Sequence, residues 1–361
     1  MSVRRVYIVL LLIVVTGIGW IQSNQWLAAT HPVKLVVPKG WPAPVYGFKD
    51  NPLTKEGIAL GKALFYDPIL SKDGTISCGS CHQSFGGFAT YDHPLSHGIN
   101  NGFSNRNAPG IVNMAWQKNF MWDGGIHHLD LQPLAPITAE NEMGETITGV
   151  LEKLNNNPTY RKKFLAAFGV RNISTAELGK ALSQFVLTLV SYNSKYDRVM
   201  RGEADFILPE KLGYEIFTKK CVTCHPPPFF TDFSFRNTGL PLDAFLQDKG
   251  RMRITGDAAD SLAFRVPSLR NVALSFPYAH DGRMATLQNV FEHYRSKEPR
   301  PAGTDPLLQK GIPLSNYEIG QLTAFLQTLT DSTLINNPAF LPEEQNRRQK
   351  QERDVHGNKG D

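Results

Sequence analysis

The chain has 361 residues, of which 41% are hydrophobic and 20% are charged, and this length is enough for two domains that each bury a core. Its glycine, proline and charged contents exclude a collagen-like or a wholly disordered chain. The formal net charge of +5 is spread along the sequence, so it gives no indication of a nucleic-acid partner.

The N-terminal segment, residues 1–30, has the pattern of a signal peptide or a membrane anchor. Arg4 and Arg5 precede an apolar run from Val6 to Ile21. The segment lacks a clear small-x-small cleavage site, which favours an anchor retained in the inner membrane over a cleaved signal peptide. Either interpretation places the rest of the chain in the periplasm, after a linker over residues 31–46.

The four cysteines belong to two Cys-x-x-Cys-His motifs, Cys78-Gly-Ser-Cys81-His82 and Cys221-Val-Thr-Cys224-His225. In such a motif two thioether bonds attach a haem c, and the adjacent histidine binds its iron. The alternative is a zinc or thiol–disulfide site, which the adjacent histidine, the duplication and the export pattern argue against. The sequence therefore predicts two covalently bound haem c groups, with His82 and His225 as iron ligands.

A weak internal repeat surrounds the two motifs. Gly61-Lys-Ala-Leu-Phe65 precedes the first motif, and Gly213-Tyr-Glu-Ile-Phe217 precedes the second. A segment that contains threonine and aspartate follows each motif, namely Ala89-Thr-Tyr-Asp92 and Phe230-Thr-Asp232. The repeat predicts two related domains that each hold one haem, one over residues 47–205 and the other over residues 206–341.

Apolar side chains recur at helical spacing in several stretches. Thr175–Met200 has the clearest stripe and predicts one long amphipathic helix. The other predicted helical stretches are Leu53–Phe65, Thr146–Phe168, Leu287–Tyr294 and Asn316–Leu329, the last of which follows the capping residue Ser315. Loops rich in Gly, Pro and Asn occupy residues 84–109 and 226–257, and residues 342–361 are predicted to be a disordered tail. The predicted fold is mostly α with long irregular loops.

Further short runs occur in order around the two haem motifs. They are Arg106-Asn107-Ala-Pro109, Trp122-Asp-Gly124, Gln132, Pro136, Glu142-Met143, Val266-Pro-Ser-Leu-Arg-Asn-Val272 and Pro277-Tyr-Ala-His280-Asp-Gly282. Together with the motifs they resemble the bacterial dihaem cytochrome c peroxidase and MauG superfamily, over about residues 47–331. The resemblance implies two cytochrome c-like domains, with a peroxidatic haem in the N-terminal one and an electron-transfer haem in the C-terminal one.

The resemblance implies catalytic roles for three side chains. Glu142 matches a distal acid that takes a proton from the inner oxygen of peroxide and returns it to the departing oxygen. Gln132 matches a distal glutamine that orients the peroxide or its water, and Pro136 matches a proline over the same pocket. Trp122 matches a tryptophan between the haems that relays an electron. Without the resemblance, Glu142 would be interpreted as a solvated loop carboxylate and Trp122 as a core aromatic residue.

The resemblance also implies a calcium ion between the domains. Asn107 matches an amide that binds this ion in relatives, together with backbone carbonyls near Ser275 and Pro277. Ligation by oxygen atoms alone suits this hard cation. No local loop with several carboxylates supports calcium independently.

The sequence departs from the best-known peroxidases of the family on the distal side of the first iron. Those enzymes carry a removable histidine ligand where this chain has Ile99. His93 and His97 lie close by as alternative ligands, but we expect an iron whose distal face is open.

A second departure concerns the distal ligand of the second iron. The expected methionine is replaced by Tyr294, as in MauG-type members, and a phenolate stabilises ferric iron whereas a thioether favours ferrous iron. Met284 and His293 remain alternatives for this position. His280 is expected at haem propionates or at the domain interface.

These features predict an oxidoreductase, for which we consider three functions. The first is a dihaem c-type peroxidase that reduces hydrogen peroxide to water with electrons from a small soluble cytochrome c or copper protein. The second is a MauG-like oxidase of a protein side chain, as in tryptophan tryptophylquinone formation, which Tyr294 and Ile99 favour. The third, a dihaem electron carrier, has no use for Glu142 and Gln132. The resemblance also allows a homodimer.

Overall fold

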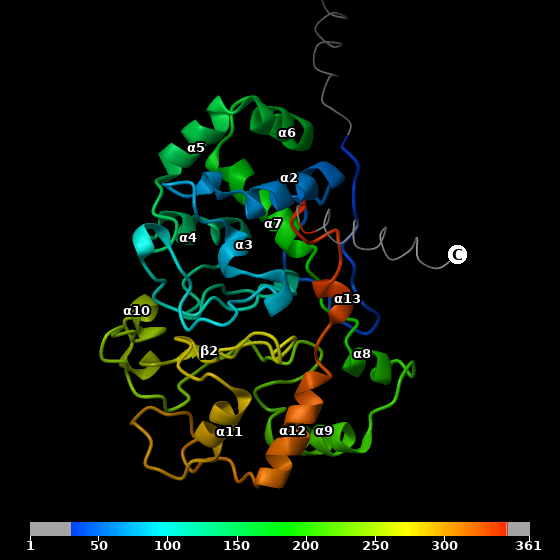
Figure 1. Cartoon of the computed structure of the whole chain (residues 1–361), viewed down its shortest axis with the longest axis vertical. Helices are drawn as coiled ribbons and strands as arrows, with labels where there is room; N and C mark the ends of the chain where they lie inside the picture. The colour runs from blue at the N-terminus through cyan, green and yellow to red at the C-terminus, as the bar shows by residue number, and fades with distance from the viewer. Residues whose placement is uncertain (1–29, 344, 346–361) are drawn as a thin grey trace, which may run out of the picture.

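The computed structural model describes residues 30–343 and 345 (Figure 1). The predicted signal peptide or anchor and most of the predicted disordered tail lie outside the described residues. Between residues 30 and 343, no helix combines the length and the apolar character that a membrane span needs.

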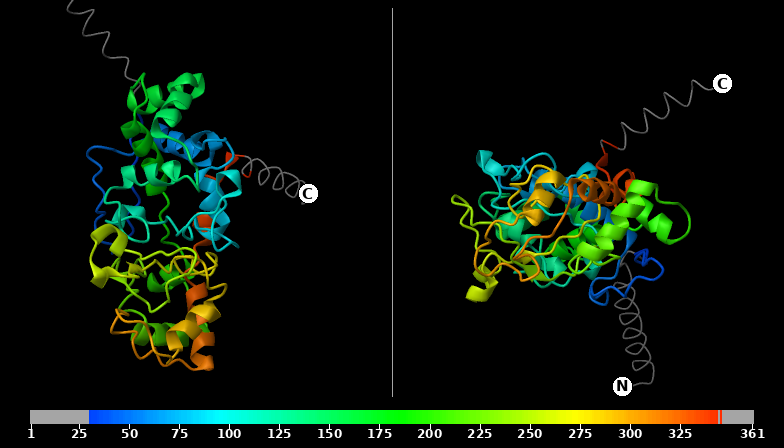
Figure 2. Two further views of the ribbon diagram at one scale, coloured as in Figure 1. Left: turned by 90° about the vertical axis from the view of Figure 1, so that its left-hand side faces the viewer. Right: turned by 90° about the horizontal axis from the view of Figure 1, so that it is seen from below.

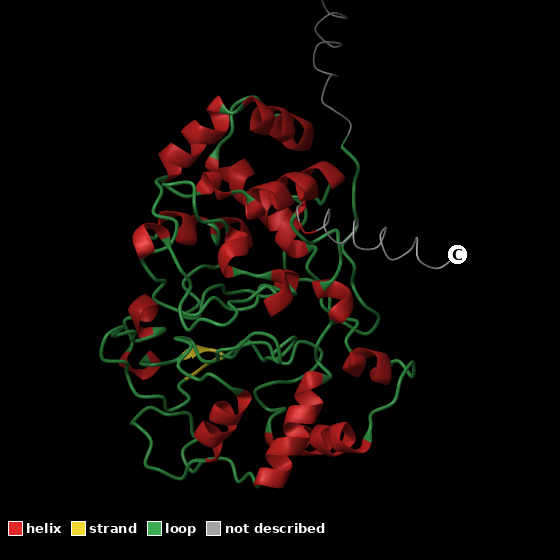
Figure 3. Cartoon of the chain, in the orientation of Figure 1, coloured by secondary structure: helices red, strands yellow, loops and turns green. Residues whose placement is uncertain are grey.

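The described part of the chain is mostly helical with little sheet, as predicted (Figure 3). The α-helices are α2 (Lys55–Tyr66), α3 (Cys78–Cys81), α4 (Leu134–Thr138), α5 (Ile147–Asn156), α6 (Pro158–Phe168), α7 (Thr175–Leu187), α8 (Lys195–Met200), α9 (Leu208–Lys220), α10 (Met252–Thr255), α11 (Leu287–Arg295), α12 (Asn316–Gln327) and α13 (Ser332–Ile335). Strands β1 (Phe235–Arg236) and β2 (Phe264–Arg265) pair antiparallel, with Phe235 opposite Arg265. Long loops connect these elements.

The molecule has two halves along its longest axis (Figures 1 and 2). Helices α2 to α7 form the upper half in Figure 1, and α9, α11 and α12 form the lower half. Each half has its own hydrophobic core, one around Leu64 and Phe185 and the other around Phe217 and Phe325. The strands and several loops lie between the halves.

One close helix pair supports each core, and glycine permits the contact. Helix α2 packs on α7, and α9 packs on α12. A Cβ atom at Gly61 would lie 1.9 Å from the carbonyl oxygen of Ala181, and one at Gly213 would lie 2.0 Å from that of Gln321. The Gly-x-x-x-Phe repeat of the sequence is therefore a repeated helix crossing, which leads in both halves to a Cys-x-x-Cys-His motif.

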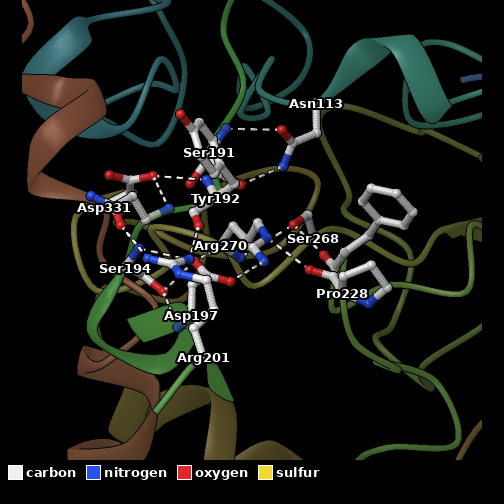
Figure 4. Close-up of polar contacts among 12 residues, drawn as sticks. Asn113, Ser191, Tyr192, Ser194, Asp197, Arg201, Pro228, Ser268, Arg270 and Asp331 are labelled. Atoms are coloured by element: carbon white, nitrogen blue, oxygen red, sulfur yellow. Dashed lines mark hydrogen bonds and ion pairs between the residues drawn. The ribbon is translucent and has the colours of Figure 1, made fainter. Parts of the chain in front are cut away.

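The prediction of a single long helix over Thr175–Met200 is wrong, because α7 ends at Leu187 and α8 begins only at Lys195. Side chains distant in sequence bind the intervening backbone (Figure 4). The Asn113 side chain accepts from Ser191 N at 2.9 Å and donates to Ser191 O at 3.2 Å. The Asp331 carboxylate accepts from the backbone N–H groups of Tyr192 and Asn193 at 2.8 and 2.9 Å. These bonds replace those that a continuous helix would have made.

The stretch predicted as helical over Thr146–Phe168 also forms two helices. Pro158 has no backbone N–H and occupies the first turn of α6, where none is needed. The Asn157 side chain caps this helix by accepting from Thr159 N and Tyr160 N. Helix α12 begins after Ser315 as predicted, and the Ser315 hydroxyl accepts from Glu318 N at 3.2 Å.

The two expected domains exchange segments. Tyr196, from the range expected to form the first domain, packs in the second core, and Leu334 packs in the first core. The chain after α12 returns to α2, where the Tyr66 hydroxyl donates to Phe340 O at 2.7 Å. A buried ion pair of 2.8 Å between Asp197 and Arg270 also joins α8 to the later part of the chain (Figure 4). These contacts tie the halves together.

We expect Gly213→Ala to lower the free energy of unfolding by about 1–3 kcal/mol, because its Cβ would collide with a backbone carbonyl that cannot move alone. Gly320→Ala in α12 is the matched control, since its Cβ would meet no atom within 4 Å. That control should be neutral or more stable by up to about 1 kcal/mol through helix propensity. Chemical denaturation measures both variants, and equal stability of Gly213→Ala and the natural chain would contradict the close crossing.

Candidate functional site

A cavity of about 360 Å³ lies beside the first Cys-x-x-Cys-His motif. The two thiols are at the ends of the short helix α3, and His82 follows it directly. All three side chains of the motif line the cavity. Most other lining residues are apolar, which suits a large planar apolar cofactor.

The second motif lies beside a cavity of about 430 Å³. Cys221, Cys224 and His225 line it, together with residues of α11 and of the loops between β2 and α11. In both halves of the molecule, a cavity therefore lies beside a packed pair of helices and is lined by two cysteine thiols and one histidine.

Each histidine of the two motifs has one ring nitrogen held by the backbone and the other available to bind iron. Nδ1 of His82 lies 3.1 Å from Phe88 O, and Nδ1 of His225 lies 3.0 Å from Phe230 O. An Nδ1–H that donates to a carbonyl leaves the lone pair on Nε2, the atom that a metal would bind. Burial lowers the pKa of both imidazoles, which favours the neutral form that a ligand requires. The four thiols form no disulfide. The residues of each cavity therefore fit a haem c.

The structure brings the predicted distal residues to the first cavity. Glu142, Gln132 and Pro136 all line it, as does Trp122. Burial raises the pKa of the Glu142 carboxyl, and the positive charge of Arg106 offsets part of this rise. Among the described residues, nothing is hydrogen-bonded to this carboxylate, whereas the amide of Gln132 donates weakly to Met121 Sδ at 3.7 Å. A partly buried acid with a raised pKa holds its proton more readily than an exposed carboxyl group does.

His82 is the single histidine among the described residues that lines the first cavity. Ile99 is buried, and its backbone N donates to Glu142 O at 2.9 Å, so it supports the loop of the distal acid. His93 and His97 are exposed and pack on each other with ring centroids 5.1 Å apart. The open distal face of the first iron stays a prediction.

The two cavities share one wall. Trp122, Asn107 and Arg265 line both of them. The indole Nε1 of Trp122 donates to Asn107 O at 2.7 Å, and Arg265 N donates to Trp122 O at 2.7 Å. Trp122 therefore lies between the two motifs. Arg265 does not stand out in the sequence, because a single arginine before the Val-Pro-Ser run carries no signal of burial.

Several side chains could approach an iron in the second cavity, which is lined by Tyr294, Met284 and His293. Nε2 of His293 lies 2.9 Å from Thr238 O, so this nitrogen is already engaged. Burial raises the pKa of Tyr294 to about 12, and a metal ion would favour the ionised phenolate. His280 stacks on Phe264 with ring centroids 3.6 Å apart, and its carbonyl accepts from Asn107 N, which places it at the domain interface.

The residues expected at calcium lie together between the halves. Asn107, Ser275 and Pro277 all line the second cavity. The Asn107 amide nitrogen donates to Pro94 O at 3.1 Å, so the side-chain oxygen is the atom available to a cation. The described residues contain no group of three or more His, Cys, Asp or Glu side chains suited to a metal ion. A cation here would depend on neutral oxygen ligands.

Comparison with known proteins gives a consistent set of similarities. The family model of the di-haem cytochrome c peroxidases matches residues 55–205. Methylamine utilization protein MauG of Methylorubrum extorquens is 37% identical over 316 residues, or 85% of this chain and 86% of the relative. Cytochrome c551 peroxidase of Nitrosomonas europaea is 34% identical over 285 residues, or 78% and 81%. The crystal structure of a MauG-like protein associated with microbial copper homeostasis has a TM-score of 0.77 and 33% identity, and covers 86% of this chain and 99% of that chain.

We expect the double variant Cys78→Ala/Cys81→Ala to carry one covalent haem c per chain instead of two, because both thioether positions of the first cavity are removed. The pyridine haemochrome absorbance per polypeptide should fall to half. The matched variant Cys221→Ala/Cys224→Ala should lose the other haem. Full haem content in either variant would contradict the assignment of that motif.

Proposed function

Since the chain belongs to the di-haem cytochrome c peroxidase family, which includes the MauG proteins, we propose that it is a periplasmic peroxidase that reduces hydrogen peroxide to water. The observation that carries this proposal is the half-buried carboxylate of Glu142, which lines the same cavity as His82. A proton-accepting group at this position serves peroxide chemistry and has no purpose in a simple electron carrier. The export pattern of residues 1–30 supports the location.

The first cavity would hold the peroxidatic haem, attached through Cys78 and Cys81, with His82 on its iron. When bound, this haem supplies the iron that receives peroxide and the redox change that breaks the O–O bond. Two electrons and two protons then convert one peroxide into two waters. The residues of the chain must position the peroxide and move these protons.

Glu142 acts as the proton carrier in this proposal. Its ionised form accepts a proton from the inner peroxide oxygen, and the resulting acid donates to the departing oxygen. Burial favours the protonated acid after the first step, since it raises the pKa of this carboxyl. The Gln132 amide can orient peroxide by hydrogen bonds, and Pro136 limits the space beside it.

The second cavity would hold the electron-transfer haem through Cys221, Cys224 and His225. Electrons from a small soluble cytochrome c or copper protein would enter there and pass to the first cavity. Trp122 lines both cavities, so its indole is suited to relay them. We further propose that Tyr294 is the second ligand of this iron and that Asn107, with the carbonyls of Ser275 and Pro277, binds calcium.

MauG-like oxidation of a protein side chain is the second candidate function. Tyr294 in the second cavity and the single histidine of the first cavity favour it, because an anionic ligand stabilises oxidised iron. A steady-state assay separates the candidates: a peroxidase consumes reduced cytochrome c or copper protein only when peroxide is present. Absence of such consumption in a chain that carries two haems would favour the side-chain oxidase or the electron carrier.

We expect Glu142→Gln to slow peroxide reduction by about 100-fold or more, because the amide cannot accept the peroxide proton. The activity of the natural chain should fall as the pH drops through the raised pKa of Glu142, and this acid limb should disappear in the variant. Glu140→Gln, in the same loop but exposed, is the control and should retain activity. Natural turnover in Glu142→Gln with both haems present would remove Glu142 from the mechanism.

We expect Tyr294→Phe to change the low-spin signal of the second haem in electron paramagnetic resonance, because the phenolate ligand is lost. Met284→Leu should leave this signal in place, although Met284 lines the same cavity. The reverse pattern, a change only in Met284→Leu, would assign the ligand to the methionine.

A further inference from the structure

The arginines that line the two cavities differ in one respect. Arg106 pairs with Asp123 and Asp248 at 2.6 and 2.5 Å, and Arg236 pairs with Asp232 and Asp305 at 2.8 and 2.7 Å. Arg253 lies 3.8 Å from Asp248. Arg265 has no ion pair with any described residue.

Arg265 is also deeply buried. It is 4% exposed, and its side chain makes one weak hydrogen bond, from Nε to Met121 O at 3.5 Å. Burial lowers the pKa of the guanidinium to about 10, and no carboxylate of the described residues offsets the cost of removing its charge from water. The remaining N–H donors of its guanidinium have no partner within the described chain.

A buried cation of this kind destabilises the fold unless an anion accompanies it. The position of Arg265 indicates which anion, because this residue lines both haem cavities. Each haem carries two propionate carboxylates, and a guanidinium binds carboxylates through paired N–H donors.

We propose that Arg265 binds propionate carboxylates of both haems and so joins the two cofactors electrostatically; this inference rests on the proposed occupancy of both cavities. The backbone of Arg265 supports the placement, since its N–H donates to Trp122 O at 2.7 Å and its strand pairs with Phe235 in β1. The charge therefore has a fixed position in the wall that contains Trp122.

A positive charge near a haem favours its ferrous form, which carries one more negative charge than the ferric form. We expect Arg265→Gln to shift the midpoint potentials of both haems to more negative values in a spectroelectrochemical titration of the full chain. Arg265→Met is a second neutral variant, without a polar group to bury, and should shift both potentials in the same direction. Arg265→Lys keeps the positive charge, so both midpoint potentials should shift less in this variant than in the two neutral variants.

Arg253→Gln is the matched control, because Arg253 lines the first cavity but its side chain is 58% exposed and lies near Asp248. Screening by water should leave the potentials nearly unchanged in this variant. Natural potentials in both neutral variants, or a shift of only one haem, would overturn the inference. Potentials of the natural chain that vary with chloride concentration, with no such variation in Arg265→Gln, would also overturn it, since the anion would then come from solvent.

Haem content separates this inference from the proposed function. Pyridine haemochrome is measured first, and two c-type haems per polypeptide are expected in the natural chain and in the variants. A natural chain without haem would refute the proposed function itself. Two haems with unaltered potentials in the neutral variants would refute only the role of Arg265.

Discussion

The hydrogen bonds of Trp122 hold the two cavities in a fixed relation. Its indole donates to Asn107 O, and its carbonyl accepts from Arg265 N, both at 2.7 Å. Because these three residues line both cavities, a displacement of the Trp122 backbone would change both sites at once. Electron transfer depends steeply on the distance between cofactors, so a rigid wall between them is what a two-centre enzyme needs.

Contacts away from the shared wall also hold the two cavities in their fixed arrangement. Arg106 joins the loop of Asp123 to Asp248 in the later half of the chain, and Arg270 reaches Asp197 in α8. The segment after α12 returns to the first core at Leu334. Each tie joins residues that are far apart in sequence, so the halves cannot separate without exposing buried charge or apolar surface. The protein therefore differs from two domains on a flexible linker.

Burial has different effects on the two sites. In the first cavity it favours the protonated form of Glu142, which would suit the proposed role of accepting and then releasing a proton. In the second cavity it raises the pKa of Tyr294, so that only a strong positive charge such as an iron would favour the phenolate. The uncompensated guanidinium of Arg265 lies between these environments, where the carboxylates of two haems would neutralise it.

The sequence by itself determined the two Cys-x-x-Cys-His motifs, the Gly-x-x-x-Phe repeat that precedes them and the candidate residues around the first cavity, because these depend on short runs of adjacent residues or on a recognisable order of such runs. It could not place the break between α7 and α8, since Asn113 and Asp331, which bind that backbone, are distant in the chain. It also could not show that Trp122 and Arg265 share one wall, or that Arg265 forms no ion pair with the residues that the structure describes. Burial and charge compensation are decided by residues from many parts of the chain, and only the tertiary structure brings those residues together.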